Sequence, residues 1–193
     1  MKRLLSLVVI LFSLISVLAS TPIRGIVQVD STAMTAFVQR HNPDFDPAIA
    51  RAFQEVGERY GIRGDMALCQ AIIETGWFRF DNGTAVKPSQ HNYCGMGVTE
   101  RGNVGCSFET IEEGVTALIQ HLFAYCCDDE LPDGEDVVDP RFKYVTRGCA
   151  PYWEDLTGRW AMNDKYAKSI LRQYDSLCRH SMMTRPAIPE IFE

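Results

Sequence analysis

The sequence is poor in the residue patterns that hold metals and nucleic acids. Its seven Cys and four His include no Cys-x-x-Cys pair and no two His at the spacing of metal ligands, so we expect no metal site and no cofactor. Positive charge is scarce as well, with 19 Lys and Arg against 25 Asp and Glu. Because binding to nucleic acid depends on clustered Lys and Arg, this balance argues against nucleic acid as a partner.

Long apolar runs are also few, and the one that is present lies near the start of the sequence. Lys2 and Arg3 precede an almost unbroken apolar stretch over residues 4–18, and a small residue, Ala19, follows it. This order predicts a signal peptide over residues 1–19 and a secreted or periplasmic protein. An uncleaved membrane anchor is the alternative, but the run is shorter than the roughly 20 residues that span a bilayer. We therefore expect no stable membrane insertion after cleavage.

The number of Cys residues is odd, which matters for a chain that is expected to be exported. Exported proteins commonly form disulfides, and seven Cys leave at least one thiol free or paired with another chain. Cys94 and Cys106 flank a Gly-rich stretch and are candidates for closing a small hairpin.

The remaining sequence has the periodicity of one mainly α-helical domain over residues 30–180, followed by a tail over residues 181–193. Capping residues and apolar spacing predict five helices, over about residues 31–41, 47–60, 65–76, 111–126 and 163–177. Between residues 92 and 108, glycines separate short β-prone pieces, which predicts a small β-hairpin lobe.

Glu74 has the surroundings that a general acid needs. Cleavage of a glycosidic bond requires a proton for the leaving oxygen, and a carboxylic acid supplies it only where its environment keeps it protonated. Ile72 and Ile73 precede Glu74, and Trp77 and Phe78 follow it, so apolar neighbours would raise its pKa by desolvation. Its expected position in the last turn of a helix adds to this effect, since the helix dipole disfavours negative charge there. A surface glutamate beside a tryptophan is the alternative from these residues alone.

Several blocks of sequence, in order along most of the chain, resemble one family of peptidoglycan hydrolases. The first block, residues 67–77, contains Gln70-Ala71 and ends in Glu74-Thr75-Gly76-Trp77, and the family has Gln-Ala followed by Glu-(Ser/Thr)-Gly-Trp. The later blocks lie at residues 91–97, 107–108, 114–125, 139–142 and 160–167. On these blocks, residues 34–174 resemble the glucosaminidase-domain family, which is glycoside hydrolase family 73.

This resemblance implies a mainly α, lysozyme-like α+β fold with a small β-hairpin lobe. It also implies hydrolysis of the β-1,4 bond after N-acetylglucosamine in peptidoglycan glycan strands, the expected partner. Glycoprotein chitobiose cores share the N-acetylglucosamine linkage and are a second candidate substrate. The family's general acid falls on Glu74, and a tyrosine that the family associates with the active site falls on Tyr166. Packing against Ile170, four residues further on, is the alternative role for Tyr166.

The sequence indicates the second catalytic group less clearly than it indicates Glu74. Glycoside hydrolases ordinarily use two carboxylates, and members of the family often place one in the β lobe, where Glu100 is the candidate. Glu109 and Asp139 are weaker candidates. If none of them acts, the N-acetyl group of the substrate could be the nucleophile, positioned by Tyr166 or Asn92.

Sugar binding needs flat apolar faces and convergent polar groups. The residues that we predict to bind substrate are Trp77, Tyr93 and Tyr125, which are aromatic, and Asn92 and Gln120, which are polar. Core packing or a structural hydrogen bond is the alternative role for each of them.

Three other functions fit parts of the sequence. A lytic transglycosylase would use the same fold and acid but release an anhydro sugar instead of adding water. A cysteine peptidase or amidase would use Cys94 as nucleophile and His121 as base, although export and six further Cys favour disulfides instead. A non-catalytic module would bind wall glycan and have no activity to lose.

Overall fold

The computed structural model describes residues 20–81, 83, 85–98 and 103–184. In these residues the chain forms five α-helices: α1 (Ser31–Gln39), α2 (Pro47–Tyr60), α3 (Gly64–Thr75), α4 (Ile111–Cys126) and α5 (Tyr166–Thr184). Short 3-10 helices lie in the connections: η1 (Pro88–Gln90), η2 (Phe142–Tyr144) and η3 (Trp153–Leu156). The mainly helical fold that the sequence predicts is therefore confirmed. The last helix begins later than predicted and continues to Thr184, past the expected start of the tail at residue 181.

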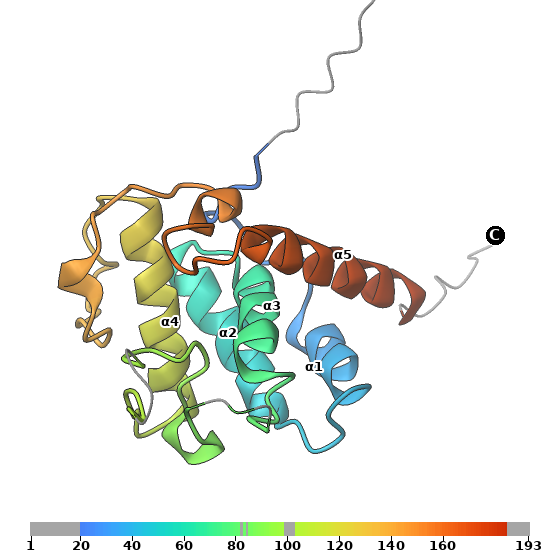
Figure 1. The fold of residues 1–193 in the computed structure, drawn as a ribbon. Coiled ribbons are helices and arrows are strands. Elements are labelled where there is room, and N and C mark those ends of the chain that lie inside the picture. The colour runs from blue at the N-terminus through green and yellow to red at the C-terminus, as the bar shows by residue number, and fades with distance from the viewer. Residues whose placement is uncertain (1–19, 82, 84, 99–102, 185–193) are drawn as a thin grey trace, which may run out of the picture.

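Helix α3 lies at the centre of the molecule. Figure 1 shows α2, α3 and α4 side by side, and α5 begins at the upper end of α3 and runs above α1. α3 packs against each of the other four helices, and most of its side chains are buried. The segment after α4, drawn in orange, passes over the top of the molecule and returns to the start of α5 (Figure 1). This path brings residues near 160 back to α3.

Local sequence signals explain where the second and third helices begin and end. Asp46 accepts a hydrogen bond from the amide of Ala48 at 2.8 Å, and Gly61 ends α2 in the left-handed conformation. Gly64 then opens α3 at a close crossing, where an added Cβ would lie 1.9 Å from the carbonyl oxygen of Phe53. Only glycine fits at this position, so the angle between α2 and α3 is fixed at the start of α3.

The predicted β-hairpin lobe is not confirmed. In its described part, residues 92–98 and 103–108, the chain forms turns and irregular backbone with no strand. The side chain of Asn92 holds this segment together, because its Nδ2 donates to the carbonyl oxygens of Met96 and Cys106 at 2.9 and 3.0 Å and its Oδ1 accepts from the amide of Met96. Gly97 and Gly105 have positive φ, which turns the backbone out of an extended path. Glu100, the candidate at the hairpin tip, lies outside the described residues.

The disulfides that export would favour are not confirmed. All seven carry free thiols in the structure, including Cys94 and Cys106, so the expected bridge between these two is not confirmed. Among the helices that the structure describes, none is long and apolar enough to cross a bilayer.

Candidate active site

Glu74 occupies the last turn of α3 and is followed at once by the end of the helix. Gly76 has φ 61° and ends α3 in the left-handed conformation. Because the rest of α3 is packed on all sides, its last turn holds the backbone of Glu74 in a fixed position. The sequence-based prediction for the position of Glu74 in the last helical turn is confirmed.

Two side chains from much later in the sequence bind the Glu74 carboxyl group. The indole Nε1 of Trp160 donates to Oε1 of Glu74 at 3.1 Å, and the phenol of Tyr166 donates to the same oxygen in a short hydrogen bond. The side-chain amide of Gln70, one turn before Glu74 on α3, donates to the Tyr166 oxygen at 2.8 Å. The carboxyl group therefore sits in a preformed cage of donors.

Burial raises the pKa of Glu74 above its ordinary value, while the hydrogen bonds from Tyr166 and Trp160 act in the opposite direction and lower it. Burial, followed by the charge of Glu74, raises the pKa of the Tyr166 phenol well above its usual value. Tyr166 therefore stays protonated at neutral pH and remains a donor. A carboxyl group with a raised pKa and fixed donors on one oxygen can give up a proton from the other.

The backbone after Glu74 makes an unusual left-handed turn. Trp77, Phe78 and Phe80 all have positive φ, at 63°, 57° and 54°. Such angles are uncommon for bulky residues and are held here by hydrogen bonds, among them one from the Asn42 side chain to the Trp77 carbonyl oxygen at 3.0 Å. The turn directs Trp77 to α1, where its ring stacks on that of His41 with centroids 3.6 Å apart. Trp77 is therefore next to Glu74 in sequence but packs elsewhere.

A groove of about 220 Å³ is lined in part by Trp160, whose indole also binds Glu74. The other lining residues are 94–98, His121, Tyr125, Arg141 and Arg159. Trp160 belongs to both the groove and the Glu74 cage. Burial, followed by the charge of Glu74, raises the pKa of Cys94, which also lines the groove. The groove thus combines Tyr125, Trp160 and two cations, and Trp160 connects it to the acid.

The sequence of this chain is similar to known glycosidases. The sequence model of the glucosaminidase family, described as mannosyl-glycoprotein endo-beta-N-acetylglucosaminidase, matches residues 50–179. An uncharacterized protein of Borreliella burgdorferi is 36% identical over 151 residues, which is 76% of this chain and 71% of that protein. The chain belongs to the glucosaminidase family. Among solved structures, the catalytic domain of the autolysin Auto from Listeria monocytogenes is 18% identical with a TM-score of 0.44, covering 85% of this chain and 91% of that one.

Membership of the glucosaminidase family makes the chain a glycoside hydrolase and confirms the resemblance that the sequence blocks indicated. It also implies peptidoglycan as the general class of substrate. Of the residues that we predicted at the site, the structure brings together Glu74 and Tyr166, and it places Tyr125 in the adjoining groove.

Three residues predicted to bind substrate are buried in this glucosaminidase domain. Asn92 and Gln120 are fully buried, and both ends of each amide are hydrogen-bonded within the protein. Gln120 donates to the phenol of Tyr60 at 2.8 Å and accepts from the amide of Val138 at 2.7 Å. Tyr93 is 2% exposed and contacts the rings of Phe53 and Phe78 in the core. In this conformation none of these three side chains lines the groove.

Sequence reasoning missed three residues that line the groove, Trp160, Arg141 and Arg159, and named His121 only as the base of a cysteine peptidase. Trp160, His121 and Arg141 fall in the blocks that resemble the family, so the sequence marked these segments as parts of the family pattern. Their convergence on one groove could not be predicted from the sequence, because it depends on how the segment after α4 returns to α3.

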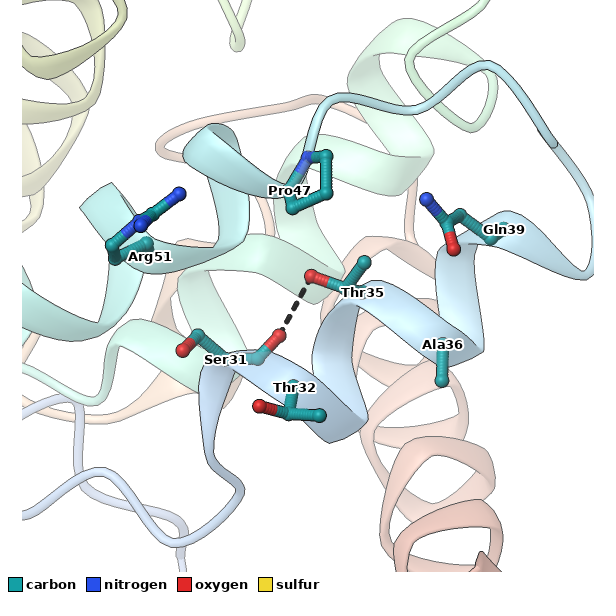
Figure 2. Close-up of a pocket in the computed structure, with 7 residues that line it drawn as sticks. All are labelled: Ser31, Thr32, Thr35, Ala36, Gln39, Pro47 and Arg51. Carbon is teal, nitrogen blue, oxygen red and sulfur yellow. Dashed lines mark hydrogen bonds between the residues drawn. The ribbon is translucent and has the colours of Figure 1, made fainter.

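A second depression of about 400 Å³ lies between α1 and the start of α2. Figure 2 shows its seven lining residues, among them Thr35, whose hydroxyl donates to the carbonyl oxygen of Ser31. None of its lining residues is an acid, and none of them contacts Glu74. This depression therefore offers no candidate for a general acid.

Proposed function

We propose that this chain is an exported endo-β-N-acetylglucosaminidase, with Glu74 as its general acid. It hydrolyses the β-1,4 bond after N-acetylglucosamine in peptidoglycan glycan strands. The observation that carries this proposal is the cage around Glu74, where burial raises the pKa while Tyr166 and Trp160 fix one oxygen. This arrangement leaves the second oxygen of Glu74 to protonate the glycosidic oxygen as the bond breaks.

The cage also supplies a reason for the role of Tyr166. Its hydrogen bond strengthens as Glu74 changes from a neutral acid to a carboxylate, because bonds to ionised groups are the stronger ones. The interaction is therefore larger in the transition state, where the proton is leaving, than in the ground state. Stabilisation of this kind accelerates the chemical step.

The groove fits a glycan that carries negative charge. Tyr125 and Trp160 offer aromatic surface to sugar rings, and their ring centroids are 5.9 Å apart. Arg141 and Arg159 add positive charge in a chain whose formal net charge is −6. Peptidoglycan strands bear carboxylates on their stem peptides, whereas chitobiose cores are neutral, so the two cations favour peptidoglycan.

The decisive experiment compares Glu74→Gln with the wild-type protein on purified peptidoglycan, measured by loss of turbidity. We expect activity to fall roughly 10²- to 10⁴-fold, the usual contribution of a general acid. Glu55→Gln, which changes an exposed acid on α2, is the matched control and should keep full activity. Since burial penalises the Glu74 carboxylate at neutral pH, Glu74→Gln should unfold at or above the wild-type temperature. Full activity in Glu74→Gln would contradict the proposal.

Mass spectrometry of the digested wall separates the proposed hydrolase from a lytic transglycosylase. Hydrolysis after N-acetylglucosamine leaves reducing N-acetylglucosamine ends, whereas a transglycosylase leaves 1,6-anhydro-muramic ends. The cysteine peptidase alternative gains no support from the site. Burial, and then the charge of Glu74, raises the pKa of the Cys94 thiol well above its usual value, which keeps it protonated and weakly nucleophilic.

A further inference from the structure

His121 and Asp139 form a second acid–base pair in the groove. His121 lies on α4, and its Nδ1 is 2.7 Å from Oδ2 of Asp139. The Asp139 side chain is fully buried, while that of His121 is 12% exposed and lines the groove. A buried carboxylate is costly unless it is well satisfied, so this pair requires an explanation beyond packing.

Hydrogen bonds at both the carboxylate and the backbone amide hold Asp139 in place. Its Oδ1 accepts from the amide of Arg141 at 2.8 Å, and its own amide donates to the side chain of Gln120 at 2.9 Å. Because a carboxylate can only accept, the proton of a neutral His121 ring lies on Nδ1 and Nε2 is left as an acceptor. Among the described residues Nε2 has no hydrogen-bond partner, and this is the arrangement by which an Asp–His pair prepares a base.

One indole ring separates this pair from the acid. The ring of His121 meets the ring of Trp160 edge-on, with centroids 5.0 Å apart, and Nε1 of Trp160 lies 3.1 Å from Glu74. Trp160 therefore contacts both Glu74 and His121, and Trp160 and His121 line the same groove. An inverting glycosidase needs an acid and a base with room between them for the attacking water.

We propose that His121 is the general base of this enzyme, oriented by Asp139, and that it completes the pair with Glu74. The proposal rests on the proposed function, because it assigns the group that acts opposite the acid. It gives to an Asp–His pair the role that the sequence assigned provisionally to Glu100.

The proposed step is a single displacement at C1 of the N-acetylglucosamine unit. Nε2 of His121 takes a proton from water as the water oxygen bonds to C1. The bond between C1 and the glycosidic oxygen breaks, its electron pair stays on that oxygen, and the proton of Glu74 neutralises it. The imidazolium that forms is stabilised by Asp139. Solvent then removes the proton from His121 and returns one to Glu74, and the product has inverted configuration at C1.

Several groups face His121. Asp139 is its direct partner, Tyr125 lies edge-on against its ring with centroids 5.3 Å apart, and Cys94, Arg141 and Arg159 line the same groove. Activity should fall at high pH as Glu74 loses its proton, because the acid must be protonated to act.

The test is chemical rescue of His121→Ala by imidazole, with muropeptide release from purified peptidoglycan as the readout. We expect kcat to fall roughly 10²- to 10⁴-fold and to recover several-fold with added imidazole, while the KM changes little. His180→Ala is the matched control, because His180 is another partly buried histidine with one arginine hydrogen bond and one ring contact, and it should keep full activity. A role confined to packing predicts no rescue.

A second variant covers the case in which His121→Ala does not fold. Asp139→Asn keeps the shape of the side chain but can stabilise the wrong ring tautomer, so we expect a large loss of kcat and an altered acidic limb of the pH profile. Proton NMR of a digested glycan should show the α-anomer first. An active His121→Ala, loss without rescue in a folded variant, or retention at C1 would overturn the proposal. Full activity in Glu74→Gln would instead overturn the proposed function, so the two failures are distinguishable.

Discussion

Two aromatic groups surround the end of α3, and only one of them contacts the Glu74 carboxyl group. The acid cage consists of Trp160, Tyr166 and Gln70, and it binds Glu74 through hydrogen bonds that converge on one oxygen. The α1 cluster consists of Trp77, His41 and Phe37, whose rings stack or tilt against one another. Both groups contain aromatic rings, but only the acid cage donates hydrogen bonds to Glu74.

The difference shows how distance along the chain misleads about distance in space. Trp77 is three residues from Glu74, yet the left-handed turn after Gly76 directs it to α1. Trp160 and Tyr166 lie 86 and 92 residues further along the chain, and both bind the carboxyl group. Burial raises the pKa of Glu74, and the two long-range hydrogen bonds oppose that rise. Trp77, by contrast, packs against rings near α1.

Replacement of Tyr166 by Phe should have the largest effect among changes to the acid cage. The variant keeps the ring and removes one hydrogen bond to an ionising group, so we expect kcat to fall roughly tenfold to a hundredfold. Because this bond lowers the pKa of Glu74, its loss should raise that pKa and move the alkaline limb of activity to higher pH. A pH–rate profile of kcat measures both effects.

Tyr174→Phe is the matched control for this variant. Tyr174 lies on the same helix, two turns further on, and its hydroxyl donates to the side chain of Gln28 at 2.8 Å. It should leave the position of the alkaline limb unchanged. If Tyr166→Phe kept full activity, or moved the alkaline limb to lower pH, the acid cage would not control Glu74.

Replacement of Trp160 by Phe should have a smaller effect in the same direction. The Tyr166 bond lowers the pKa of Glu74 more than the Trp160 bond does, so the alkaline limb should move up by less. We expect kcat to fall by about tenfold or less, as for the loss of one modest hydrogen bond. Both bonds end on the same oxygen, so the double variant should differ from the product of the single effects. If the alkaline limb moved further in Trp160→Phe than in Tyr166→Phe, the Trp160 bond would be the one that lowers the pKa of Glu74 more.

The sequence predicted the helices well because their signals are local. Asp46 caps α2, Thr110 caps α4, and Gly76 ends α3 beside Glu74, as the spacing of polar and apolar residues indicated. Asn92 was harder to interpret, since a polar residue in a Gly-rich segment is expected to face a ligand. Its amide instead replaces the ladder of hydrogen bonds that a hairpin would have supplied.

The groove was harder to predict because it is assembled from separate parts of the chain. The bond between His121 and Asp139 joins residues 18 positions apart across the end of α4, and Trp160 follows η3 on the return to α5. Each residue type was present in a block that resembles the family, but no periodicity relates them. Their meeting depends on the path of the segment after α4 (Figure 1).

Replacement of Trp77 by Ala should have the smallest effect on catalysis. It tests whether the α1 cluster serves packing and not catalysis. The ring is partly buried against His41 and Phe37, so we expect a loss of stability of about 2 kcal/mol, below the 3–5 kcal/mol typical of a fully buried aromatic residue. Thermal unfolding should show this loss, while kcat and its pH profile stay unchanged, because the Glu74 carboxyl group keeps both of its donors. Trp77→Phe should recover much of the stability. A raised KM for peptidoglycan at wild-type stability would instead give Trp77 the substrate-binding role that its place in the sequence predicts, and would make both aromatic groups parts of one binding surface.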